Sequence, residues 1–207
     1  MAFYTEKTFT TPDGSKINYV DEGRDNKQTF LFVHGWSSKG TDFAKIGKEL
    51  VKTYRVVWMD HRGHGKTISD GPYTLEQVAA DVKNLIEYLG LEDVIFVGYS
   101  MGAHILFQYV RDYGCLHLSK AAIIDMSPKL LNDAEWKHGL YQGHYRAEHY
   151  ERDKGIMREN FPEFGGFFFG QVMGTHHPEE VRDYKARLIY KLLSRFVAKK
   201  SQYGMLA

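Results

Sequence analysis

The segment Gly98-Tyr99-Ser100-Met101-Gly102 places a serine between two glycines, at the spacing of a nucleophilic turn. A short apolar run at 94–97 precedes it, and an apolar pattern with helical spacing at 101–113 follows it. The glycines let the strand and the helix approach closely, so that the serine Oγ is lifted clear of the backbone. The positive end of the helix dipole then faces that oxygen. The pattern predicts that Ser100 is a nucleophile.

A serine hydroxyl is a weak nucleophile until a base removes its proton, and a carboxylate commonly orients that base. Asp125 ends a predicted strand at 121–124 and is a candidate acid, although a carboxylate at a strand end also often braces a loop. Histidines that follow it are candidate bases or exposed polar residues: His138, His144, His149, His176 and His177. We interpret His61, His64 and His104 as structural residues.

Composition excludes several other classes of function. The net charge is +1 with neutral histidines, so neither nucleic acid nor a membrane surface is an expected partner. Cys115 is the single cysteine, and the absence of metal-ligand spacing predicts no metal and no cofactor. The sequence shows neither a signal peptide nor an apolar run of the ~20 residues that span a bilayer. A soluble, cytoplasmic protein is expected.

Short runs rich in β-branched and aromatic residues predict strands that are covered on both faces: 29–33, 54–59, 94–97 and 121–124. Helical patterns alternate with them: 42–53, 74–89 and 101–113. The second of these helices opens on Thr74-Leu75-Glu76-Gln77, which predicts a capping box. A hairpin of 3–10 and 16–20 precedes the first run. This order predicts an α/β fold with a doubly wound, mostly parallel sheet, whose strand ends share one edge.

Strand patterns stop after Pro128, and residues 130 to about 200 read as mostly helical. We therefore divide the chain into a core at 1–128 and a helical region at 129–207, within a single structural domain.

Three blocks make the chain resemble the α/β-hydrolase superfamily, in its serine esterase, haloperoxidase and C–C hydrolase branch. They are His34-Gly35-Trp36, Asp60-His61-Arg62-Gly63-His64-Gly65 and the segment around Ser100, each directly after a predicted strand. The resemblance implies that the backbone N–H groups of Trp36 and Met101 form an oxyanion hole, and that 129–207 is a cap over the strand ends. The His34 ring is expected to pin its loop by hydrogen bonds, and Asp60 and Arg62 to brace loops.

The resemblance also implies two further strands, followed by the acid and the histidine of a catalytic triad. Neither strand is visible before Ala207, and no histidine after Asp125 stands at the family's position. Some members place the acid where Asp125 stands. The chain is expected to be truncated after its sixth strand, or to use a cap histidine as base. An open sheet edge would favour a homodimer by edge pairing or domain swapping.

The function that the resemblance implies is carboxylesterase-like: cleavage of a carboxylic ester or related acyl bond through an acyl-enzyme at Ser100. Serine rather than aspartate at this position argues against haloalkane dehalogenase and epoxide hydrolase chemistry. Thioester, lactone, C–C bond and perhydrolysis reactions stay open. Cap aromatics predict a small-molecule acyl substrate with an apolar group: Trp136, Tyr141, Tyr145, Tyr150 and the five phenylalanines between 161 and 169. The alternative is a catalytically incomplete hydrolase-fold protein that binds a small ligand or a partner.

Overall fold

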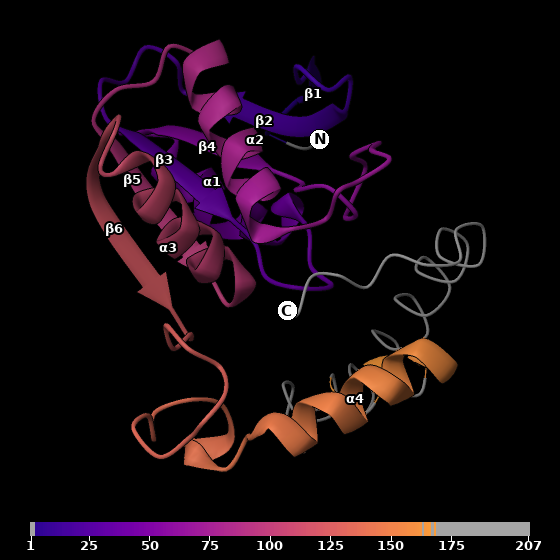
Figure 1. The fold of residues 1–207 in the computed structure, drawn as a ribbon. Helices are drawn as coiled ribbons and strands as arrows, with labels where there is room; N and C mark the ends of the chain where they lie inside the picture. The colour runs from indigo at the N-terminus through magenta and orange to yellow at the C-terminus, as the bar shows by residue number, and fades with distance from the viewer. Residues whose placement is uncertain (1–2, 163, 167, 169–207) are drawn as a thin grey trace. The chain divides into compact units, whose positions relative to one another are not determined.

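The computed structural model describes residues 3–162, 164–166 and 168 (Figure 1). Its six-stranded sheet has the order β1-β2-β4-β3-β5-β6. The strands are β1 (Glu6–Thr10), β2 (Lys16–Glu22), β3 (Thr29–Val33), β4 (Arg55–Met59), β5 (Val94–Tyr99) and β6 (Leu118–Ile124). The pairs β1–β2 and β2–β4 are antiparallel, and the other three pairs are parallel. The predicted mostly parallel α/β sheet is confirmed.

The helices alternate with the strands as the sequence predicted. They are α1 (Ala44–Leu50), α2 (Leu75–Tyr88), α3 (Met101–Tyr113) and α4 (Ala147–Glu159), with 3₁₀ turns η1 (Gly40–Phe43) and η2 (Tyr141–Gly143). At the start of α2, the Thr74 hydroxyl accepts a hydrogen bond from the Gln77 N–H at 3.3 Å. The Gln77 side chain instead donates to Asp81 at 3.3 Å. The capping box predicted at this end is therefore only half formed.

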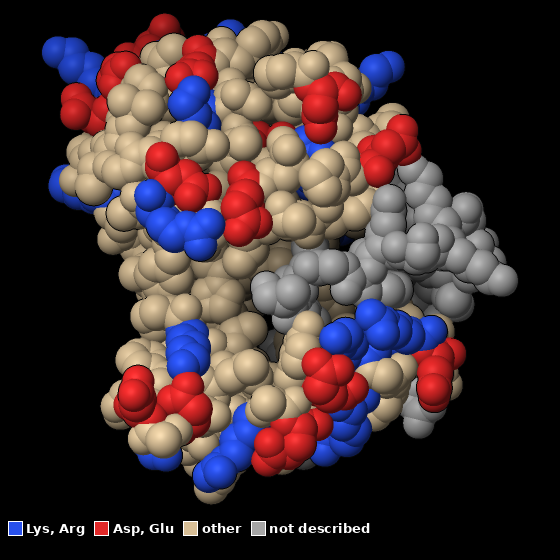
Figure 2. Space-filling model, in the orientation of Figure 1, with Lys and Arg blue, Asp and Glu red and all other residues tan. Residues whose placement is uncertain are grey.

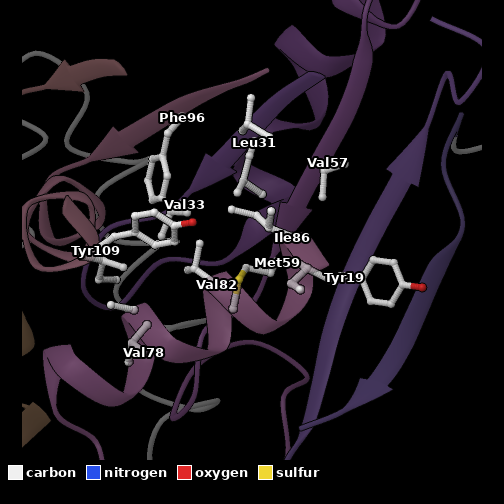
Figure 3. Close-up of a cluster of buried hydrophobic side chains, with 14 of the residues drawn as sticks. Tyr19, Leu31, Val33, Val57, Met59, Val78, Val82, Ile86, Phe96 and Tyr109 are labelled. Carbon is white, nitrogen blue, oxygen red and sulfur yellow. The ribbon is translucent and has the colours of Figure 1, made fainter. Parts of the chain in front are cut away.

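Apolar side chains pack on both faces of the sheet, which is why its central strands read as nearly continuous hydrophobic runs. On one face, Val78, Val82 and Ile86 of α2 point at the strands, together with Tyr109 of α3 (Figure 3). On the other face, Trp58 and Phe32 pack with partly buried side chains that include Ala44 and Leu50 of α1. Each fully buried aliphatic side chain contributes ~1.5–3 kcal/mol.

The chain reverses its direction across the sheet at β3. From β3 it passes through α1 to β4 on one side, and from β4 through α2 to β5 on the other. The loops that follow β3 and β5 therefore diverge from neighbouring strand ends, where open α/β sheets form their ligand crevice. Val33 and Gly98, near the carboxyl ends of these strands, are register partners. The fold thus brings the segments around His34 and Ser100 together.

Strand β6 lies at the edge of the sheet in the part of the chain that the structure describes (Figure 1). Ile123 and Ile124 are 50% and 43% exposed there. An edge with free backbone groups and apolar side chains is a surface on which another strand can pair. The predicted homodimer through this edge stays a prediction.

The described residues fall into two compact units, one ending at Pro128 and the other beginning at Lys129. In the second unit the helical expectation is wrong for residues 130–146, which form turns and the short η2. Asn132 Oδ1 accepts the Gly139 N–H at 2.7 Å, and Asp133 Oδ1 accepts the Trp136 N–H at 2.8 Å. Such side chains offer the backbone partners that compete with a helix.

Charged side chains are interspersed by sign on the face shown in Figure 2. Along α4, Arg152 pairs with Asp153 at 2.8 Å, and Lys154 pairs with Glu151 at 3.2 Å. None of the helices that the structure describes combines the length and the apolar character needed to cross a membrane.

Candidate active site

Ser100 occupies the sharp turn between β5 and α3. Its backbone has φ 53° and ψ −121°, a conformation that is strained for a residue with a Cβ atom. The Ser100 N–H donates to Ile124 O at 2.9 Å, and Ser100 O accepts the Ala103 N–H at 2.8 Å. Two hydrogen bonds thus hold the serine backbone from either side, in β6 and in α3.

The two glycines of the motif are required by close backbone contacts. A Cβ atom on Gly98 would lie 2.5 Å from Gly102 O, and one on Gly102 would lie 2.0 Å from Val33 O. No side chain fits at either position without moving the backbone. These contacts explain the glycine–x–serine–x–glycine spacing: β3, β5 and α3 meet within van der Waals distance at the serine.

The loop after β3 passes directly beside the nucleophile. A Cβ atom on Gly35 would lie 2.9 Å from Ser100 Cβ and 3.4 Å from Ser100 Oγ. Trp36 is the next residue in that loop. Met101 is the first residue of α3, where the first four N–H groups of a helix have no intrahelical acceptor and the dipole is positive. The structure thus brings the Trp36 loop and the Met101 N–H to Ser100.

Three histidine rings pack behind this loop. The rings of His34 and His61 stack with centroids 3.7 Å apart, and that of His64 lies 4.2 Å from His61. His34 Nδ1 donates to Gly35 O at 2.8 Å, and His34 Nε2 accepts the His61 N–H at 3.3 Å. His64 Nε2 accepts the Ser37 N–H at 3.1 Å. The His34 ring therefore pins its loop, as expected.

All three rings are held neutral. Burial lowers the pKa of His34 and of His61 well below the usual value, and neighbouring histidines lower both pKa values further. Burial lowers the pKa of His64 to about 4. Charging any ring here would place a cation among buried groups beside two other imidazoles.

Asp60 and Arg62 brace the loops, as predicted. Asp60 Oδ1 accepts the Gly40 N–H at 2.7 Å, while Oδ2 accepts from the Asn18 side chain at 3.0 Å. Arg62 is fully buried and makes a two-pronged ion pair with Asp81, with N···O distances of 2.6 and 2.7 Å. Such bidentate pairs fix orientation as well as charge.

Asp125 follows β6 with φ 54° and is exposed. Burial raises the pKa of Tyr99, and the negative charges of Asp125 and Asp42 raise it further, so that the Asp125 carboxylate acts on the residue next to Ser100. Among the described residues of the first unit, no histidine donates a hydrogen bond to the Asp125 carboxylate. Its role as triad acid stays a prediction.

The predicted candidate bases fall into two groups. His138, His144 and His149 lie in the second unit, and His176 and His177 lie outside the described residues, as do Phe167 and Phe169 of the expected cap. On α3, His104 Nε2 donates to Ser127 O at 2.8 Å. In the described part of the chain, no histidine nitrogen of the first unit hydrogen-bonds to Ser100 Oγ. The same part holds no cluster of three or more His, Cys, Asp or Glu side chains arranged for a metal ion.

Sequence reasoning missed two contacts at this site. It did not pair His64 with Ser37, and it did not place Gly35 against the nucleophile. His64 and Ser37 are 27 residues apart and belong to different loops. Only the parallel register of β3 and β4, with Val33 beside Met59, brings these loops together.

A family model described as the alpha/beta hydrolase fold matches residues 28–188. Over 128 residues the chain is 34% identical to a non-heme haloperoxidase of Rhodococcus erythropolis, covering 61% of this chain and 46% of the relative. It is 35% identical over 129 residues to a bifunctional esterase/perhydrolase of Acinetobacter calcoaceticus, with the same coverage. An epoxide hydrolase of Caenorhabditis elegans is 30% identical over 103 residues, which is 47% of this chain and 25% of that protein.

Solved structures show the same fold. An esterase from Exiguobacterium antarcticum superposes with a TM-score of 0.77 at 22% identity, covering 96% of this chain and 74% of the esterase. A bromoperoxidase from Bacillus anthracis gives a TM-score of 0.69 at 26% identity, covering 80% of this chain and 59% of the bromoperoxidase. The chain spans about half the length of the curated haloperoxidase and esterase relatives.

Proposed function

The chain belongs to the α/β-hydrolase fold family, and from that premise we propose that it is a serine hydrolase that cleaves a carboxylic ester or a related acyl bond. The observation that carries the proposal is the strained turn of Ser100, with Gly35 against its side chain and α3 starting at Met101. This geometry leaves the serine oxygen beside two segments whose backbone N–H groups can stabilise an oxyanion.

In the proposed reaction Ser100 Oγ attacks the substrate carbonyl carbon. The π electrons of the carbonyl move to its oxygen, and the N–H groups of Trp36 and Met101 donate to that oxyanion. Loss of one such donor in other enzymes costs ~3–4 kcal/mol of transition-state stabilisation. Collapse of the tetrahedral intermediate expels the alcohol and leaves an acyl group on Ser100. Water then attacks the acyl-enzyme and releases the acid.

A histidine must take the Ser100 proton and deliver it to the leaving alcohol. The proposal assigns this base to one of the histidines that follow Asp125 or to a residue supplied from outside this chain, with Asp125 as the acid. A serine nucleophile supports the chemistry named for the esterase/perhydrolase relative rather than that of the epoxide hydrolase relative, whose family uses aspartate at this position. The proposed substrate is a small molecule with an apolar acyl group.

The test is intact-mass analysis after treatment with a fluorophosphonate, which phosphonylates only an activated serine. Wild type should gain one adduct, and Ser100→Ala should gain none. Ser119→Ala is the matched control, because the Ser119 hydroxyl lies on β6 and donates to Asp93 O at 2.8 Å, away from the turn. A folded wild-type sample that gains no adduct would contradict the proposal.

One observation favours a second candidate function. Within the first unit, none of the described histidines hydrogen-bonds to Ser100 Oγ, which is the arrangement expected of a hydrolase fold that binds ligands without turnover. In that case wild type and Ser100→Ala would both stay unlabelled. Both would bind a small apolar ester with equal affinity in calorimetry.

A further inference from the structure

The loop after β3 contains a strained residue just after Trp36. Ser37 has φ 60°, in the left-handed region that is unfavourable for a residue with a Cβ atom. The Ser38 N–H donates to Gly35 O at 3.3 Å, so that Gly35 to Ser38 forms a turn. Positive φ at the third residue is typical of a type II turn, where glycine is preferred. A serine holds this conformation only if its surroundings enforce it.

The His64 ring provides that constraint. Its Nε2 accepts the Ser37 N–H at 3.1 Å, and its Nδ1 lies 3.2 Å from Arg62 O. A carbonyl oxygen only accepts, so Nδ1 carries the proton and Nε2 presents its lone pair to Ser37. Ser37 is only 7% exposed, so water is a poor substitute acceptor for its N–H. Both ring nitrogens are thereby occupied, and neither is available as a general base.

The ring itself is held from two sides. Arg62, whose carbonyl accepts from His64, is fixed by its ion pair with Asp81 and by a 3.0 Å bond from Nη1 to Gly71 O. The His61 ring packs edge-on against His64 with centroids 4.2 Å apart. The loop after β4 is therefore a rigid support for the loop after β3.

We propose that His64 is the positioning residue of the oxyanion hole. Trp36 lies between two fixed residues: Gly35, which contacts Ser100, and Ser37, which is tied to His64. With both neighbours fixed, the Trp36 N–H keeps one direction relative to Ser100 Oγ. This inference rests on the proposed function for the role of Trp36, but the tie between Ser37 and His64 stands independently of it.

The experiment compares His64→Phe, which keeps a ring but loses the acceptor, with His64→Gln, whose amide can accept from Ser37 and donate to Arg62. His117→Phe is the matched control, because His117 hydrogen-bonds Glu92 at 2.9 Å at the other end of β6. The rate of fluorophosphonate labelling should fall by about 10- to 100-fold in His64→Phe. It should be largely restored in His64→Gln and unchanged in His117→Phe.

A second readout does not depend on catalysis. In His64→Phe the Ser37 amide should exchange with solvent at least about 10-fold faster, as expected for the loss of one hydrogen bond. The Val97 amide of β5 in the same sample should stay protected and reports that the fold is intact. In wild type, ¹⁵N shifts should place the His64 proton on Nδ1.

The outcomes separate the two proposals. A wild type that is never labelled refutes the proposed function, and the exchange and ¹⁵N results still decide the role of His64. Equal labelling rates and equal Ser37 exchange in His64→Phe and wild type overturn the inference. His64→Phe could unfold, in which case Val97 would exchange freely. The role of His64 is then decided by the wild-type tautomer and by the labelling rate of His64→Gln. A proton on Nε2 of His64 in wild type overturns the inference.

Discussion

At the scale of single residues, the site stores strain at Ser100. Its φ of 53° is a conformation that glycine adopts at no steric cost, whereas residues with a Cβ atom are destabilised there by ~1–3 kcal/mol. Two hydrogen bonds, to Ile124 O and from the Ala103 N–H, hold it in place. Removing the Cβ atom should relieve the strain, and removing only the hydroxyl should not.

Ser100→Gly should therefore raise the free energy of unfolding by about 1 kcal/mol relative to Ser100→Ala, after allowing for the greater entropy of an unfolded glycine. Urea titration in a Trp136→Phe background, followed by the fluorescence of Trp36 and Trp58, measures this difference. Both variants should be inert to fluorophosphonate. Equal stability of the two variants would show that the serine backbone is not strained.

The turn that holds Ser100 could be predicted from sequence because its signal is local. Glycines two residues away on either side, a strand before and a helix after are all visible in one short segment. The partnership of His64 with Ser37 carries no such signal. This contact joins two loops that are close only because of the register of β3 and β4. No sequence pattern near His64 or Ser37 indicates it.

At the scale of elements, the approach of α3 to β3 should be the least tolerant contact of the fold. In Gly102→Ala the new Cβ would lie 2.0 Å from Val33 O, a backbone atom that cannot rotate away. Helix α3 would have to move outward, and we expect a loss of more than about 3 kcal/mol of stability. Hydrogen exchange of β5 amides measures the loss.

Gly155→Ala is the control for this prediction. Gly155 lies inside α4, and a Cβ atom there would meet nothing within 4 Å. The same change should strengthen that helix by up to about 1 kcal/mol and leave β5 exchange unaltered. If Gly102→Ala were as well tolerated as Gly155→Ala, the close packing of α3 on β3 would be wrong.

Elements were predicted well where one periodicity dominates and poorly where side chains bond their own backbone. The run at 29–33 coincides with β3, and the helix pattern at 74–89 matches α2 to within one residue at each end. Residues 130–146 carry enough apolar residues to suggest helices. The side chains of Asn132 and Asp133 instead accept local N–H groups, which periodicity alone does not reveal.

At the scale of the whole molecule, the order of strands and helices and the resemblance to a known family predicted the architecture. They did not predict what pairs with β6, the edge strand of the sheet in the described residues. The fold was predictable because each strand–helix unit repeats one handed step. The expected homodimer depends on what pairs with Ile123 and Ile124, and a strand pattern does not specify its partner.

The buried His34 and His61 and the half-buried His64 also make the stability of the first unit depend on pH. The pKa values of His34 and His61 are well below 6.5 in the folded state, and that of His64 is about 4. Above pH 6.5 the rings are neutral in both states and contribute no pH dependence. Below pH 6.5 the unfolded chain binds protons that the folded chain refuses, so stability should fall between about pH 6.5 and 4.

Each such histidine adds up to about 1.4 kcal/mol per pH unit to the slope of the free energy of unfolding against pH. The three together can therefore approach about 4 kcal/mol per pH unit. The raised pKa of the buried Asp81 carboxyl opposes this trend near the acidic end of the window, because the folded state then binds the extra proton.

Urea titrations of a Trp136→Phe protein, which keeps only the tryptophans of the first unit, measure this slope of stability against pH. His64→Gln should remove about one third of it, because one titrating ring is lost. His138→Gln, on the surface of the second unit, should remove none. A stability that stays flat from pH 7 to 5 would mean that the three rings are already accessible to protons in the folded protein.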